Sequence, residues 1–286
     1  MATAFAPSAS SASTTPRAIV NRTVGDRHGP ITRLMSPGDL GELLKPFVFL
    51  DLFEVESMSG RGFPPHPHSG IATLTVFLEG AIAYADSTGK SGELSAGSVE
   101  WMRAGSAVWH SSEPVGVGPV RGYQLWLALP PELELAPPES IYVEPSRVAG
   151  DGRIRVVLGS YKGHVSSIPL PLPITYLHVR LKDGEGWTYV PEPGHDLAWL
   201  ALNAGRLAVA GMTLERELAV FADGEEPIEM VAHGEVELVI GSAARAPYPL
   251  VTGYHSVHTS AAALAQGERN ISDLERTPAV AALRAR

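Results

Sequence analysis

Short apolar runs separated by glycine- and proline-containing turns recur along almost the whole chain, and this spacing restricts the fold more than any other feature. Turn signals that follow one another every ~8–12 residues are typical of an antiparallel sandwich or barrel. The composition agrees, because 29 Gly and 24 Pro suit strands joined by tight turns. A chain of 286 residues is long enough to bury two cores of this kind. We therefore predict an all-β protein.

A stretch rich in proline and glutamate, residues 130–145, interrupts the strand pattern near the middle of the chain. Such composition is common where few contacts cross between domains. We place an N-terminal β-barrel domain at residues 18–132 and a C-terminal one at residues 133–286. The two halves show the same alternation of short strands and turns, so the prediction is two barrels in tandem.

The two ends of the chain differ from this pattern. Near the C-terminus, Ser260 is a suitable N-cap for a helix from Ala261 to about Arg276, with Leu264, Ile271 and Leu274 on one stripe. At the other end, residues 1–17 are mostly small or hydroxylated and carry a single charge, at Arg17. That composition predicts a disordered tail without the layout of a secretory signal.

The charge and cysteine content exclude several classes of protein. A net charge of −9 opposes direct binding to the phosphates of nucleic acid. No stretch approaches the ~18–20 consecutive apolar residues of a membrane helix. The absence of Cys excludes disulfides, thiolate metal sites and cysteine nucleophiles, so any metal must bind to His and carboxylate groups. These features suit a cytoplasmic protein that binds neither nucleic acid nor membrane.

The residues most suggestive of chemistry are His66 and His68, with His110 on a later predicted strand. We expect residues 66–78 to form one long strand, in which both histidines share a face with Ala72 and other apolar side chains. Two histidines at positions i and i+2, joined by a third from a neighbouring strand, can bind one divalent ion and leave coordination positions open. The alternative is that hydrogen bonds satisfy all three histidines at the mouth of a barrel.

The segments around these histidines resemble the pirin family, a branch of the bicupins in the cupin superfamily. The resemblance begins near Thr32, runs to the C-terminus, and rests on Gly62-Phe63-Pro64-Pro65-His66-Pro67-His68-Ser69-Gly70, Leu78-Glu79-Gly80, Asp86-Ser87-Thr88-Gly89, Trp101-Met102-Arg103-Ala104-Gly105, His110-Ser111-Ser112-Glu113, Gln124-Leu125-Trp126 and Thr175-Tyr176-Leu177. It implies two cupin barrels of the jelly-roll type in tandem, followed by the C-terminal helix. It also implies one metal, usually iron, in the N-terminal barrel.

The resemblance assigns His66, His68 and His110 as ligands of a divalent metal. Fe(II) is the expected ion, with Ni, Mn, Cu or Zn as alternatives. The family's fourth ligand is a glutamate, but the matching position here is Ser112 and the glutamate is Glu113. If a β-bulge turns Glu113 inward, it becomes the fourth ligand and the catalytic base. If the strand is regular, Ser112 faces the metal and Glu113 is a surface acid.

Two further positions complete this part of the prediction. A second carboxylate of the family pattern is Ala72 here, so the metal would be bound by neutral histidines and water. In the second half, His195 lies in a turn but no His-x-His pattern occurs. We therefore expect the C-terminal barrel to be metal-free.

Two functions follow from the resemblance. Some pirins cleave flavonols such as quercetin with O₂, which implies a quercetin 2,3-dioxygenase-type oxidoreductase acting on a flavonol or a related chelating substrate. Other pirins are regulators, which implies a non-catalytic protein that binds a transcription factor or a metabolic enzyme. The expected partner is accordingly a small aromatic molecule or another protein.

Overall fold

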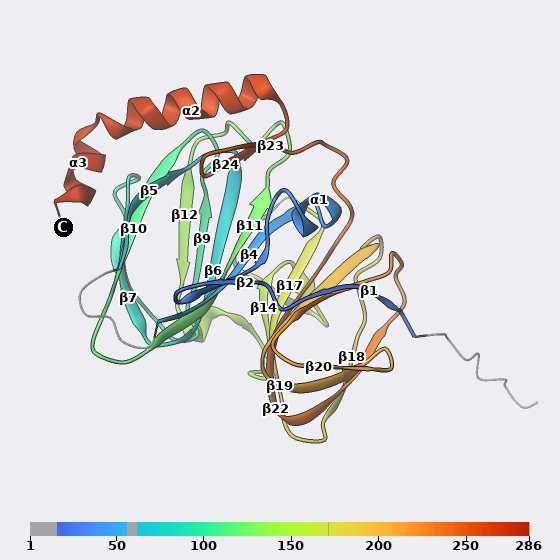
Figure 1. The fold of residues 1–286 in the computed structure, drawn as a ribbon. Coiled ribbons are helices and arrows are strands. Elements are labelled where there is room, and N and C mark those ends of the chain that lie inside the picture. The colour runs from blue at the N-terminus through green and yellow to red at the C-terminus, as the bar shows by residue number, and fades with distance from the viewer. Residues whose placement is uncertain (1–15, 56–61, 171, 286) are drawn as a thin grey trace, which may run out of the picture.

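The computed structural model describes residues 16–55, 62–170 and 172–285, and it contains two β-barrels side by side (Figure 1). The first barrel is built from two antiparallel sheets. The larger sheet has the order β12 (Glu139–Val143), β9 (Val99–Arg103), β6 (Ile71–Glu79), β11 (Val120–Ala128), β4 (Phe47–Val55), β3 (Ile31–Met35) and β2 (Asp26–His28). The smaller sheet has the order β5 (Phe63–His68), β10 (Val108–Pro114), β7 (Ala81–Asp86) and β8 (Ser91–Ser95).

The second barrel is formed by one continuous sheet that curves around a single core. Its main path is β1 (Ile19–Thr23), β21 (Leu218–Phe221), β19 (Leu197–Val209), β22 (Ile228–Ala243), β17 (Ile174–Leu181), β14 (Ile154–Leu158) and β13 (Ala149–Gly150), while β18 (Gly186–Tyr189) and β20 (Met212–Leu214) pair with β22 and β19. Shorter elements are the hairpin β15 (Ser160–Tyr161) and β16 (His164–Val165), helix α1 (Leu40–Leu43) and the 3-10 turn η1 (Pro145–Arg147). The prediction of an all-β fold with two barrels is confirmed.

The two barrels exchange segments, so the predicted boundary at residue 132 does not coincide with the division between the sheets. Strand β12, assigned by sequence to the second domain, pairs with β9 of the first barrel. Strand β1, assigned to the first domain, pairs with β21 of the second barrel. Residues 1–15 lie outside the described residues. Arg17, which was placed in a disordered tail, is buried and donates hydrogen bonds of 2.7 Å to the carbonyls of Ala222 and Asp196.

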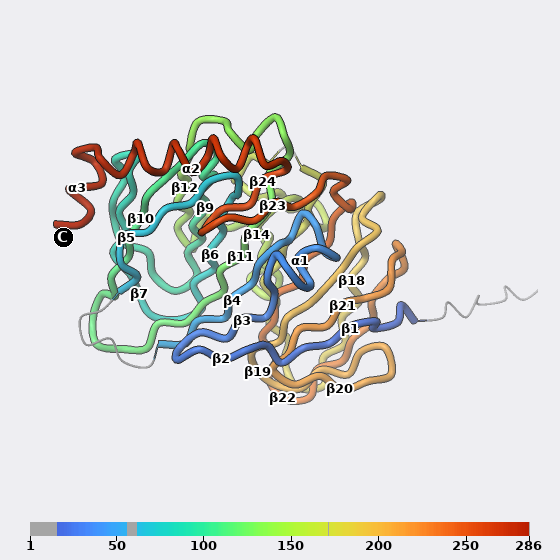
Figure 2. Tube along the Cα trace, turned by 45° about the horizontal axis from the view of Figure 1, so that its top comes forward, coloured from blue at the N-terminus to red at the C-terminus, as the bar shows by residue number. Residues whose placement is uncertain are grey.

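The last part of the chain returns from the second barrel to the first (Figure 2). It forms the hairpin β23 (Val251–Gly253) and β24 (Ser256–His258), then α2 (Ala261–Glu275) and α3 (Pro278–Arg284). The prediction for α2 is confirmed, because the Ser260 side chain accepts a hydrogen bond from the Ala263 amide. Helix α3, which begins at a proline, was not predicted. Both helices pack over the outer face of β10, around Trp109.

The expected single strand over residues 66–78 is interrupted at Gly70, and that prediction is wrong. Gly70 has φ +75°, a conformation that only glycine adopts easily, and a Cβ there would approach the carbonyl oxygen of Val257 to 2.1 Å. The break sends β5 and β6 to different sheets. As a result, Ala72 does not share a face with the histidines and packs instead in the core between the barrels.

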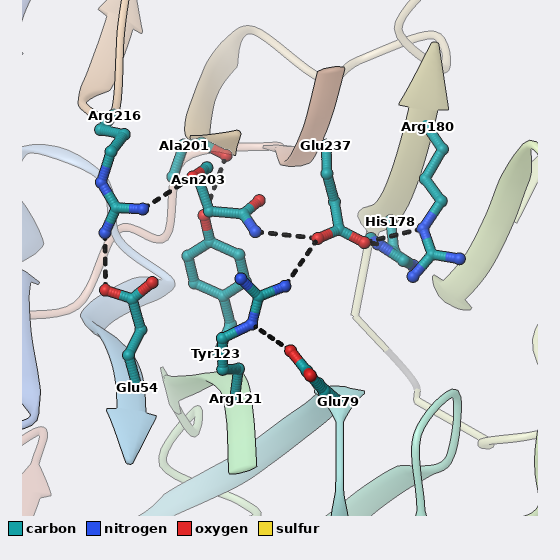
Figure 3. Close-up of polar contacts among 10 residues, drawn as sticks. All are labelled: Glu54, Glu79, Arg121, Tyr123, His178, Arg180, Ala201, Asn203, Arg216 and Glu237. Atoms are coloured by element: carbon teal, nitrogen blue, oxygen red, sulfur yellow. Dashed lines mark hydrogen bonds and ion pairs between the residues drawn. The ribbon is translucent and has the colours of Figure 1, made fainter. Parts of the chain in front are cut away.

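The barrels meet through an apolar core bordered by a polar network. In the core, the ring of Phe47 contacts Trp199 edge-on at 5.3 Å between centroids. Figure 3 shows the network, in which Arg121 pairs with Glu79 at 2.9 Å and lies 3.9 Å from Glu237 of the second barrel. Arg216 of the second barrel likewise pairs with Glu54 of the first at 2.6 Å. Contacts of both kinds hold the two barrels together.

Candidate metal centre

Two paired strands bring the three predicted histidines together. His66 and His68 project from β5, and His110 lies opposite His66 on β10. One ring nitrogen of each histidine lies within 4.8 Å of the others. Among the described residues, this is the only group of three or more His, Cys, Asp or Glu side chains arranged to hold a metal ion.

The hydrogen bonds of the rings determine which nitrogen faces the centre of the group. His66 Nδ1 lies 2.8 Å from the carbonyl oxygen of Pro64, and His68 Nδ1 lies 3.1 Å from that of His255. Because a carbonyl only accepts, each Nδ1 carries the proton and each Nε2 keeps its lone pair. His68 Nε2 is buried without any hydrogen-bond partner among the described residues. An unpaired buried nitrogen of this kind is what a metal ligand requires.

The protonation state of the rings suits a cation. Burial lowers the pKa of His66, and it lowers the pKa values of His68 and His110 well below their usual range. Each ring is therefore neutral at pH 7 and can donate a lone pair. His66 Nε2 and His110 Nε2 are 2.9 Å apart. Two nitrogens bound to one ion at right angles, with bonds of ~2.0–2.1 Å, have about this separation. The residues present fit a divalent metal.

Strand β10 is regular at the position that decides the fourth ligand. It pairs with β7 without a shift from His110 to Pro114. In the pairing with β5, His110 lies opposite His66 and Ser112 lies opposite Phe63. The chain thus advances three residues on β5 but two on β10, so the extra residue lies in the proline segment of β5. Ser112 therefore faces the barrel interior beside His110, whereas Glu113 is exposed. The structure does not bring Glu113 to the three histidines.

A carboxylate that sequence reasoning missed lies next to the group. Glu100 on β9 is 5% exposed, and its Oε1 is 4.0 Å from His110 Nδ1. Its Oε2 accepts a 2.9 Å hydrogen bond from Thr75. Burial, with the nearby charge of Asp86 adding to it, raises the pKa of Glu100 to about 7. In the sequence, Glu100 could have been noticed as a charged residue between the apolar residues Val99 and Trp101.

The C-terminal hairpin completes the centre from the other end of the chain. Its turn residue His255, with φ +58°, directs its carbonyl toward His68. His258 attaches the hairpin to the barrel. Its Nδ1 lies 3.1 Å from Glu134 Oε2, and its Nε2 lies 3.0 Å from Ser69 Oγ. This Ser–His–Glu chain is fully buried, so it acts as an anchor and offers no accessible nucleophile. Neither His255 nor His258 belongs to a His-x-His pattern, so no local motif points to this anchor.

A cleft of about 440 Å³ opens beside His66 and His68, between the first barrel and the C-terminal hairpin. Its walls include Phe63 and the rings of Phe49 and Trp126, which stack with centroids 4.0 Å apart. Arg33 lies over the Phe49 ring at 4.0 Å and is held by a bidentate ion pair with Asp51. This volume is in the range of ~300–1,000 Å³ typical of small-molecule sites, and the lining suits a flat aromatic ligand.

The second barrel has a different interior. Its core is filled by apolar side chains from β17, β19, β21 and β22, with no gathering of three metal-ligand side chains within the described residues. His195 lies 2.8 Å from Ser242 Oγ, and His178 lies 3.0 Å from Glu237. Each of these histidines therefore has a hydrogen-bond partner within the second barrel.

The described part of the chain contains no helix long and apolar enough to cross a membrane.

Comparison with known proteins places this site in a family. Residues 30–127 match the Pirin family model. A pirin-like protein of Caulobacter vibrioides is 34% identical over 215 residues, which cover 70% of this chain and 74% of the relative. A putative quercetin 2,3-dioxygenase of Vibrio cholerae is 32% identical over 63% of this chain and 69% of its own length.

Solved structures show the same fold. The crystal structure of a quercetin 2,3-dioxygenase from Acinetobacter baumannii superimposes with a TM-score of 0.82 at 22% identity, over 89% of this chain and 96% of that one. A bacterial pirin from Escherichia coli in complex with nickel(II) gives a TM-score of 0.61 at 20% identity, over 80% and 96% of the two chains. From the sequence match, the fold and the histidine group together, we conclude that the chain belongs to the pirin family.

Proposed function

We propose that this protein is a metal-dependent dioxygenase of the quercetin 2,3-dioxygenase type, acting on a flavonol or a related chelating aromatic substrate. The observation that carries the proposal is the convergence of His66, His68 and His110 beside a cleft with stacked aromatic walls. Relatives and structural neighbours named as quercetin dioxygenases support it.

In this proposal the three histidines hold the ion, with Fe(II) as the expected metal. Held there, a divalent ion would supply Lewis acidity toward a chelating substrate that enters the cleft. Three neutral ligands leave the charge of the ion uncompensated, and a chelating enolate would supply the missing charge.

The side chains of the cleft bind and orient the substrate. Phe49, Phe63 and Trp126 give the cleft an apolar wall against which an aromatic ring of the substrate can pack. Arg33 is held in place by Asp51 and can donate to a substrate oxygen at the mouth of the cleft. The burial of His68 and His110 keeps water away from the inner side of the centre.

The test is reconstitution of metal-free protein with Fe(II) under anaerobic conditions, followed by addition of quercetin and O₂. We expect O₂ consumption that matches the loss of flavonol absorbance, and neither in the His66→Ala variant. Parallel reconstitution with Ni, Mn, Cu and Zn identifies the ion that supports turnover. Full metal occupancy without turnover by any of these ions would contradict the proposal and favour a non-catalytic regulator.

A further inference from the structure

The three histidines differ in what lies behind them. The Nδ1 atoms of His66 and His68 each face a backbone carbonyl, which is fixed in place by the fold. Behind His110 Nδ1 lies the Glu100 carboxylate, whose Oε1 is 4.0 Å away. A metal-bound histidine almost always donates its other N–H to a carboxylate, a carbonyl or water. Only the third histidine of this group has a carboxylate in that place.

Glu100 is held so that one oxygen stays available to His110. Its Oε2 accepts a hydrogen bond from the buried hydroxyl of Thr75, which fixes the side chain on the barrel interior. No Lys or Arg side chain within the described residues pairs with Glu100. A buried carboxylate without a cation is unfavourable, so the arrangement is stabilised when a positive charge enters nearby.

The other acids near the centre are unsuitable for this role. Asp86 is buried but accepts from the Thr88 amide at 2.7 Å and from the Tyr142 hydroxyl at 2.7 Å. Glu113 is exposed on the outer face of β10. Ser112 occupies the inward position on that strand and carries no charge. The negative charge that the loss of the family's carboxylates removed from the centre is thus present across the barrel, on β9 of the larger sheet.

We propose that Glu100 is a positioning residue for the metal: when a divalent cation binds the three histidines, the Glu100 carboxylate accepts a hydrogen bond from His110 Nδ1–H. This contact needs an approach of about 1 Å from the present 4.0 Å separation. It fixes the orientation of the His110 ring, increases the basicity of Nε2 and partly compensates the charge of the ion. The inference rests on the metal site of the proposed function.

The test compares Zn(II) binding to metal-free parent protein and to Glu100→Gln, by competition with a chelator of known affinity. Gln keeps the shape of the side chain and removes the charge. We expect Zn(II) affinity to fall by ~10–100-fold in Glu100→Gln. The matched control is Glu93→Gln, the same change at an exposed position of β8, which should bind as the parent does. Thermal unfolding of the metal-free proteins checks that both variants are folded.

Proton NMR of the Zn(II)-loaded proteins provides a readout that a purely structural role would not affect. We expect one histidine Nδ1–H resonance, shifted downfield by a carboxylate acceptor, to move upfield in Glu100→Gln while the other two remain. Equal Zn(II) affinity in parent and Glu100→Gln, or three unchanged resonances, would overturn this inference and leave the proposed function standing. A parent that binds no Zn(II), Fe(II) or Ni(II) would overturn both.

Discussion

Each of the two barrels buries a glutamate beside a histidine, but the pKa of the glutamate is shifted in opposite directions. In the second barrel, Glu237 receives hydrogen bonds from His178, Arg180 and Asn203 (Figure 3). Burial alone would raise the pKa of Glu237, but these hydrogen bonds outweigh it and lower the pKa to about 2. In the first barrel, Thr75 is the only hydrogen-bond donor to Glu100 within the described residues, and burial raises the pKa of Glu100 to about 7. The Glu237 carboxylate is thus paired with donors of its own barrel, whereas Glu100 lies beside a histidine group that fits an external cation.

The largest expected difference between the barrels is in metal content. His68→Ala should reduce bound metal to background, because it removes one of three ligands, while the fold stays intact on its aliphatic core. The matched change in the second barrel, His195→Ala, should leave metal content unchanged. Elemental analysis of protein purified without an affinity tag measures both. Retained occupancy in His68→Ala, or lost metal in His195→Ala, would remove the distinction between the barrels.

A second prediction concerns stability against acid, which should depend on Glu237. Because its folded-state pKa is below the usual 4.5, its stabilising contribution is fully present above about pH 4.5 and is lost as the pH falls toward 2. We expect a contribution of about 2–3 kcal/mol at pH 7 that Glu237→Gln lacks. Denaturant unfolding of both proteins between pH 7 and 3 measures it. Parallel pH curves for the two proteins would show that the network contributes nothing of this kind.

The smallest expected effects concern the two neighbouring positions on β10. Ser112→Glu places a carboxylate on the inward face beside His110 and should tighten Fe(II) binding, by about tenfold if it gains ~1.4 kcal/mol. Glu113→Gln alters an exposed side chain and should change stability by less than about 0.5 kcal/mol. Anaerobic Fe(II) titrations of the parent and of both variants measure the change in Fe(II) affinity. Weaker Fe(II) binding in Ser112→Glu, together with a clear loss of Fe(II) affinity in Glu113→Gln, would show that Glu113 is the fourth ligand.

The parts of the site that the sequence predicted are those set by local geometry. His66 and His68 share a face because strand side chains alternate, and the same alternation separates Ser112 from Glu113 on β10. The motif around His110 then indicated which later strand joins them. These relations depend on spacing within a few residues, which a sequence displays directly.

The parts that could not be predicted depend on contacts between distant segments. The carbonyl that orients His68 comes from His255, 187 residues later, and no local pattern marks it. The strand break at Gly70 depends on the close approach of Val257, which is equally remote. Glu100 was recognisable only as a charge within a mostly apolar strand, since its relation to His110 exists only across the closed barrel.

The dependence of His68 on the His255 carbonyl also has a consequence in time. Translation at ~5–20 residues per second separates these two residues by about 10–40 s, so the strands carrying the histidines leave the ribosome well before their last partner exists. A nascent chain in this interval has a histidine cluster whose rings are only partly fixed. We therefore expect the centre to be completed only late in synthesis, and a chain that ends before the final hairpin to lack the carbonyl that orients the His68 ring.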